Sequence, residues 1–207
     1  ALPIFTEQPE YNGTQLIHSK VIASYLRQLL RNDLQYAPFR MEGMEQDVRE
    51  MMEIDTPQGK LALQIGGTID RLDSKGDTLR IVDYKTGGTP KTPENIEQLF
   101  TPADNRPNYI FQTFLYAAIL CRKQSLKVAP SLLYIHRAAS ESYSPVIEMG
   151  APRQPKVPVN NFAFFEDEFR ERLHGLLQEI FSQEETFSQT EDTRKCEYCD
   201  FRSLCKR

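Results

Sequence analysis

The chain has 207 residues, with 25 Lys or Arg and 29 Asp or Glu, so its formal net charge is −4. This length suits one domain, or one domain with a small appendage, that buries a core of its own. No run of about 18 apolar residues occurs, which excludes a membrane-spanning helix, and the acidic balance excludes binding to nucleic acid through bulk positive charge alone. The negative net charge does not exclude a nuclease, because the carboxylates that bind a catalytic metal are themselves counted among the acidic residues.

Hydrophobic periodicity predicts a helix near the start of the chain and several strands after it. Apolar residues recur at helical spacing over 14–34. The predicted strands are 39–45, 48–54, 61–72 and 79–84. The segment 73–77 is rich in Gly, Asp and Ser, so it predicts a turn that joins the last two strands into a hairpin.

A long polar loop and a more helical second half follow. The loop, 86–107, contains four prolines and a predicted helical turn at 96–100, and its length is typical of a functional segment. The later elements are a helix at 109–123, strands at 131–135 and 146–149, and a helix at 164–187. We therefore expect an α/β fold with a central mixed sheet, helices on both of its faces and a cysteine-rich C-terminal extension.

Two aspartates and a lysine on the predicted hairpin form the pattern that carries chemistry. Asp70 and Asp83 lie on adjacent strands, and such a carboxylate pair suits a hard divalent cation such as Mg²⁺ or Mn²⁺. Lys85 lies two residues after Asp83 and therefore projects to the same side of its strand. Its ammonium group could orient an attacking water or stabilise charge on a phosphate. The alternative is a structural ion pair, which is the commoner role of an Asp-x-Lys sequence taken alone.

The wider string resembles the RecB-like branch of the PD-(D/E)XK nucleases, which includes the nuclease domains of AddB- and RecB-type helicase-nuclease subunits. The resemblance rests on GGTIDRLD at 66–73, LRIVDYKTG at 79–87, a QxxxY motif at Gln112 and Tyr116, and the C-terminal cysteines. It implies a restriction-endonuclease-like fold and a metal-dependent DNA exonuclease in the cytoplasm. The implied setting is a double-strand-break repair helicase-nuclease with an AddA-like partner subunit. A stand-alone single-strand exonuclease of the CRISPR-associated type and a non-cutting scaffold that binds DNA or a partner are the alternatives.

The same resemblance suggests roles for individual residues. Asp70 and Asp83 would bind Mg²⁺ or Mn²⁺, with the Tyr84 carbonyl as a third ligand, and Lys85 would position water. Gln112 and Tyr116 are four residues apart and share a helix face, from which they would hold the DNA strand. Without the resemblance, a core tyrosine and a surface glutamine explain this pair equally well.

Further candidates lie upstream in the chain. Glu45 is the candidate for an additional catalytic acid, with Glu42 and Glu50 as competitors in the same acidic run. His18 corresponds poorly to the metal-binding histidine of many family members, because its helix directly precedes the predicted sheet. Arg71, together with the basic residues of the tail, could contact phosphates.

Three cysteines crowd the end of the chain. Cys196, Cys199 and Cys205 match the C-terminal ligands of a 4Fe-4S cluster, which needs four thiolates. Cys121 lies on an apolar helix and is expected to be buried and inert. We therefore expect an N-terminally truncated nuclease domain over 1–190, and a cysteine-rich tail over 191–207 that packs on it. The fourth cluster ligand and the metal-binding histidine would precede residue 1.

Overall fold

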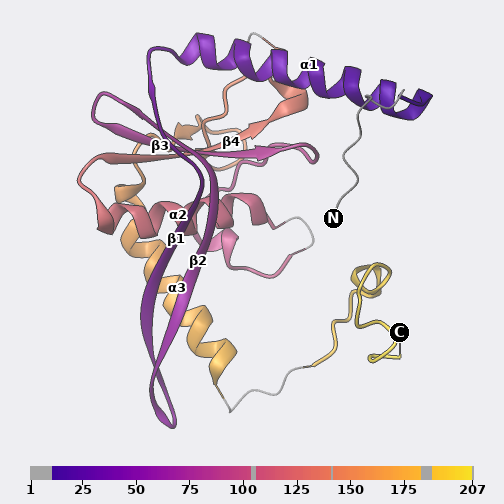
Figure 1. The fold of residues 1–207 in the computed structure, drawn as a ribbon. Coiled ribbons are helices and arrows are strands. Elements are labelled where there is room, and N and C mark those ends of the chain that lie inside the picture. The colour runs from indigo at the N-terminus through magenta and orange to yellow at the C-terminus, as the bar shows by residue number, and fades with distance from the viewer. Residues whose placement is uncertain (1–10, 104–105, 141, 183–187, 207) are drawn as a thin grey trace, which may run out of the picture.

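A four-stranded mixed sheet forms the centre of the computed structural model, which describes residues 11–103, 106–140, 142–182 and 188–206 (Figure 1). Its strands are β1 (Arg40–Thr56), β2 (Gly59–Lys75), β3 (Thr78–Lys85) and β4 (Lys127–Tyr134), in that spatial order. The first three strands run antiparallel, and β4 runs parallel to β3. The crossover between these two parallel strands carries helix α2 (Asn108–Lys123).

Helices cover both faces of the sheet, as the sequence predicts. Helix α1 (Gly13–Tyr36) lies on one face, and α2 and α3 (Glu166–Phe181) lie on the other (Figure 1). The smaller elements are β5 (Glu148–Met149), β6 (Val157–Pro158), and the 3₁₀ turns η1 (Glu97–Leu99), η2 (Ile135–Arg137), η3 (Phe162–Phe164) and η4 (Thr193–Cys196). The predicted helical turn at 96–100 coincides with η1.

The larger core lies between the sheet and α2, and aromatic rings fill it. Phe114 of α2 packs against Phe162 and Phe169, with ring centroids 4.9 and 6.2 Å apart, and each of these three side chains is fully buried. Arg170 of α3 binds both carboxylate oxygens of Glu50 on β1 at 2.8 Å. Arg170 also donates to the Ala118 carbonyl of α2, so α3 links β1 to the helix that carries the predicted QxxxY pair.

Helix α1 is less buried than its periodicity suggests. Asn12 and Gln15 form a reciprocal capping box that explains where the helix begins. Only part of the helix covers the second, smaller core, through Tyr25 and Leu29. Its other large apolar side chains are exposed: Leu16, Ile17, Val21, Ile22, Leu26, Leu30 and Leu34. Helical spacing thus identified the helix, but it did not identify which of its faces packs.

Three predicted boundaries are wrong. The extended segments predicted at 39–45 and 48–54 are one strand, β1, whose register shifts between Met41 and Gly43 without ending the strand. The strand predicted at 146–149 is reduced to β5, while Val146 makes an isolated bridge to Ser131. The helix predicted from residue 164 begins at Glu166 after a 3₁₀ turn and ends at Phe181, and part of its predicted end, 183–187, lies outside the described residues.

Candidate active site

The two aspartates meet where the backbone ladder between β2 and β3 ends. The last hydrogen-bonded pair in register is Arg71 with Val82, so the next step along both strands places Asp70 opposite Asp83. Beyond this pair, a side chain replaces the backbone as the acceptor. Oδ2 of Asp70 accepts the Tyr84 amide hydrogen, with 2.7 Å between N and O. One oxygen of Asp70 is thereby fixed beside the backbone that follows Asp83.

Asp83 is a buried carboxylate with an incompletely satisfied charge. Its residue is only 3% exposed, and its Oδ2 lies 2.5 Å from the Lys85 ammonium nitrogen without hydrogen-bond alignment. Burial raises the pKa of Asp83 above its ordinary value; Lys85 works in the opposite direction, and the negative charge of Asp70 adds to the rise. A carboxylate held in this way is a good site for a cation.

A chain of contacts orients the Lys85 side chain. Its ammonium nitrogen lies 3.4 Å from Gln112 Oε1 and 4.4 Å from the centroid of the Tyr109 ring. Gln112 in turn donates through Nε2 to the Tyr116 hydroxyl at 2.9 Å. The QxxxY pair therefore reaches the Asp83–Lys85 ion pair through Gln112.

Tyr116 itself is part of the core. It is 4% exposed, and its ring packs over Gly67 of β2, where an added Cβ would lie 2.7 Å from the tyrosine hydroxyl. The glycine thus makes room for this ring. The buried hydroxyl can orient Gln112, whereas the half-buried Gln112 is the member of the pair that can face a substrate.

Among the three acidic candidates on β1, Glu45 occupies the position nearest the pair. The register of β1 against β2 places it opposite Asp70, and it is an exposed residue with a positive φ of 48°. Such a conformation is uncommon for a residue other than glycine, and it is found preferentially at functional sites. Glu42 contacts a serine of β2, and Glu50 is held by Arg170.

Of the two remaining candidates, the structure changes the expectation for Arg71. Arg71 is 3% exposed and is bound by carboxylates inside the protein, so the prediction that it contacts phosphates is wrong. His18 is an exposed residue of α1, and its poor correspondence to the metal-binding histidine of the family stays a prediction.

The donor set fits a hard divalent cation. Two carboxylates converge at the end of the ladder, and one of them is buried with an oxygen that lacks an aligned donor. Within the described ranges, no group of three or more His, Cys, Asp or Glu side chains gathers at one point. Further ligands would therefore be the Tyr84 carbonyl or water, which suits Mg²⁺ because it keeps several waters.

The C-terminal cysteines do not form such a group either. Cys196, Cys199 and Cys205 lie on successive turns of the tail, where they are free thiols. Three apolar side chains of the tail, Tyr198, Phe201 and Leu204, are 92%, 67% and 80% exposed. Burial raises the pKa of Cys121 to about 11, in keeping with an unreactive thiol.

A hollow beside Lys85 was not anticipated from the sequence. It has a volume of about 330 Å³ and lies between the loop after β3 and the start of α2. Its lining includes Gly88, Lys91, Arg106, Tyr109 and Tyr134. The only sequence signal was the length and proline content of the loop, which gave no indication that its two cations and the two tyrosines face one cavity.

The aspartate pair and the lysine thus lie at the open end of the β2–β3 hairpin, next to helix α2 and within a mixed sheet. The family model of the PD-(D/E)XK nuclease superfamily matches residues 3–206, and the chain belongs to this superfamily. No curated protein matches the chain. None of the helices in the described part of the chain is long and apolar enough to cross a membrane.

Proposed function

We propose that this chain is a divalent-metal-dependent DNA exonuclease domain. The observation that carries the proposal is the convergence of Asp70, Asp83 and Lys85 at the end of the β2–β3 ladder, in a chain of the PD-(D/E)XK nuclease superfamily. A purely structural Asp–Lys pair would not require a second carboxylate next to it, since like charges repel. That repulsion supports a role in binding a cation.

Some residues of the site would bind the metal, and others would orient the attacking water. Asp70, Asp83 and the Tyr84 carbonyl would hold the metal, which would supply positive charge to stabilise the phosphate oxygens. Lys85 pairs with Asp83, and Gln112 supplies a second contact that keeps the ammonium group at the site. From there the ammonium group orients the attacking water and adds positive charge beside the phosphate. Glu45, whose position in β1 is opposite Asp70, is the acid that we propose as an additional catalytic residue.

The hollow beside Lys85 supports a single strand as substrate. Its lining combines two cationic side chains, Lys91 and Arg106, with the rings of Tyr109 and Tyr134. Aromatic rings stack on bases while cations follow the phosphates, which is the general arrangement for binding single strands. Gln112 lies three residues after Tyr109 on the same helix, so the strand would run from the hollow to the metal site.

The setting we propose is the nuclease domain of an AddB-type subunit in a double-strand-break repair helicase-nuclease with an AddA-like partner. The motifs at 66–73 and 79–87 and the cysteine spacing support it. The same site would serve a stand-alone single-strand exonuclease, and a scaffold would keep the fold but cut nothing.

DNA cleavage tests the proposal directly. End-labelled linear single-stranded DNA is expected to be degraded to nucleotides or short oligonucleotides in Mn²⁺ or Mg²⁺, and not in EDTA. Circular single-stranded DNA of the same sequence is expected to persist, because an exonuclease needs an end. Degradation of the circle would make the chain an endonuclease, and binding without cleavage of either substrate would make it a scaffold.

The cysteine tail gives a second measurement. We propose that Cys196, Cys199 and Cys205 are three ligands of a 4Fe-4S cluster whose fourth ligand is not among the residues of this chain. The 207-residue chain, purified without oxygen, is therefore expected to lack stoichiometric iron and sulfide, since such clusters are held by four thiolates. The Cys121→Ser variant is the control. About four irons per chain that disappear in this variant would identify Cys121 as the fourth ligand and contradict the expectation.

A further inference from the structure

On the α1 side of the sheet, β2 and β3 are joined by side chains that the proposed chemistry does not use. Nη1 of Arg71 donates to the Tyr84 hydroxyl at 2.8 Å. Arg71 directly follows Asp70 in β2, and Tyr84 lies between Asp83 and Lys85 in β3. The contact therefore ties together the immediate neighbours of both carboxylates.

This tie lies where the backbone ladder no longer holds the two strands. Arg71 and Val82 form the last pair in register, and beyond them the Tyr84 amide donates to the side chain of Asp70. Tyr84 is thus held twice by consecutive residues of β2, at its backbone by Asp70 and at its hydroxyl by Arg71. The two contacts together fix how far apart the strands are at the aspartate pair.

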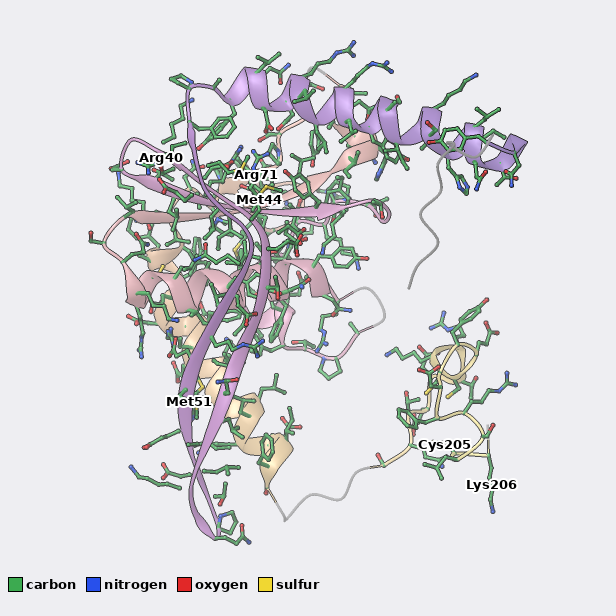
Figure 2. All side chains as sticks on the ribbon, in the orientation of Figure 1. Arg40, Met44, Met51, Arg71, Cys205 and Lys206 are labelled. Carbon is green, nitrogen blue, oxygen red and sulfur yellow. The ribbon has the colours of Figure 1, made fainter. Side chains whose placement is uncertain are left out.

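Arg71 is itself held firmly. Its two terminal nitrogens bind the two carboxylate oxygens of Asp33 on α1 at 2.9 and 2.7 Å, and Nη2 also donates to Asp73 at 2.8 Å. A second arginine, Arg80, lies 2.5 Å from Asp73. Figure 2 shows Arg71 in the layer between α1 and the strands. We call these four residues, with Tyr84, the Arg71 brace.

The brace is a costly way to build a core. Asp73 is 0% and Arg71 3% exposed, and both keep a side-chain atom without a hydrogen-bond partner, Asp73 Oδ1 and Arg71 Nε. Burial opposes the charge on Arg71, but the hydrogen bonds that Arg71 donates to Asp33 and Asp73 outweigh this effect and hold the pKa of Arg71 above its ordinary value. Well-packed apolar side chains are often as stabilising as such a buried ionic group, or more so. Its position behind the aspartate pair suggests a purpose other than stability.

We propose that Arg71 and Tyr84 are positioning residues, which set the separation of Asp70 and Asp83 so that the two carboxylates share one divalent cation. The inference rests on the proposed metal-dependent function. Groups that hold metal ligands in place commonly determine affinity, and Mg²⁺ tolerates little departure from its ligand distances. The arginine does not touch the metal or the substrate; it acts through the two strands.

The Tyr84→Phe variant tests the proposal, because it removes the hydroxyl and leaves the ring and the backbone amide. Its dissociation constant for Mn²⁺, measured by titration calorimetry without DNA, is expected to rise about tenfold. In cleavage assays at saturating Mn²⁺, the KM for DNA is expected to stay unchanged. The Asp33→Asn variant, which loosens Arg71 from α1, is expected to weaken Mn²⁺ binding to a smaller extent.

Tyr143→Phe is the matched control. This tyrosine also loses a buried hydroxyl, one that donates to the Leu132 carbonyl and accepts from the Tyr134 amide at 2.9 and 2.8 Å, but it does not connect β2 to β3. Its Mn²⁺ affinity is expected to match that of the parent chain. Equal Mn²⁺ affinity of Tyr84→Phe and Tyr143→Phe would overturn the positioning role while leaving the proposed nuclease intact. A parent chain that binds no Mn²⁺ would overturn both.

Discussion

Replacing Asp83 with asparagine is expected to reduce Mn²⁺-dependent DNA cleavage by about a thousandfold, because a metal ion supplies several kcal/mol of transition-state stabilisation and each 1.4 kcal/mol is about tenfold in rate. Asparagine keeps the size of the side chain but removes the charge that would hold the cation. Single-turnover cleavage of end-labelled DNA measures the loss. Asp77→Asn is the control, since Asp77 is an exposed aspartate at the opposite end of the same hairpin, paired with Lys127.

The same variant is expected to unfold at a higher temperature than the parent when both are free of metal at neutral pH. The pKa of Asp83 is raised in the native state, so the native state keeps this proton to a higher pH than the unfolded state does. The free energy of unfolding of the parent therefore falls as pH rises from the ordinary aspartate pKa through the raised pKa of Asp83. The Asp83→Asn variant does not lose this free energy, because the asparagine side chain has no proton to release. The difference in melting temperature should therefore vanish as pH falls below the ordinary aspartate pKa of about 3.8. An Asp83→Asn protein that cleaves like the parent, or that is less stable than the parent at neutral pH, would contradict the assignment.

Local rules were sufficient to place the hairpin and the charged side chains that it carries. The alternation of side chains along a strand put Lys85 on the same side as Asp83, and the structure brings their charged groups within 2.5 Å. A tight turn between two apolar strands was enough to pair the segments that carry Asp70 and Asp83. Helical spacing likewise located α2 to within one residue at its start and placed Gln112 one turn from Tyr116.

Contacts between distant segments could not be read in the same way. Arg71 sits in a string of charged residues and was expected to face phosphates, but its partner Asp33 is 38 residues away on α1. Glu50 was also a candidate catalytic acid, but in the structure its carboxylate accepts a hydrogen bond from Arg170, which lies 120 residues further along the chain. Sequence shows that a charge exists and on which side of its element it projects; it does not show which element will cover that side.

The conformation of Glu45 is another feature that no pattern predicts. Its segment alternates poorly, so the sequence placed a break near it, whereas the strand continues through a residue with positive φ. The acidic run made Glu45 the candidate, but it left Glu42 and Glu50 as competitors. The register against β2 adds a structural reason for that preference, because the pairs on either side of Glu45 place it opposite Asp70.

Replacing Lys85 with methionine is expected to lower the rate of DNA cleavage by about a hundredfold, the loss typical of removing one group that stabilises charge in the transition state. Methionine retains most of the apolar stem that packs beside Tyr109 but lacks the ammonium group. Mn²⁺ affinity is expected to stay the same or increase, because Lys85 competes with a metal ion for the Asp83 carboxylate. This combination of slow cleavage and unchanged metal binding distinguishes the role of Lys85 from that of Asp83. Loss of Asp83 should remove cleavage and metal binding together.

Calorimetry with Mn²⁺ and single-turnover cleavage on the same preparation give both quantities for Lys85→Met. Lys127→Met is the control, since this exposed lysine forms an ion pair with Asp77 at the far end of β3 and β4. A Lys85→Met chain that no longer binds Mn²⁺ would show that the lysine supports the site rather than acting on the phosphate. Cleavage at the rate of the parent would show that it does neither, and that the Asp83–Lys85 contact is an ordinary ion pair. Slow cleavage with full metal binding is the result expected if the ammonium group acts only once the phosphate is in place.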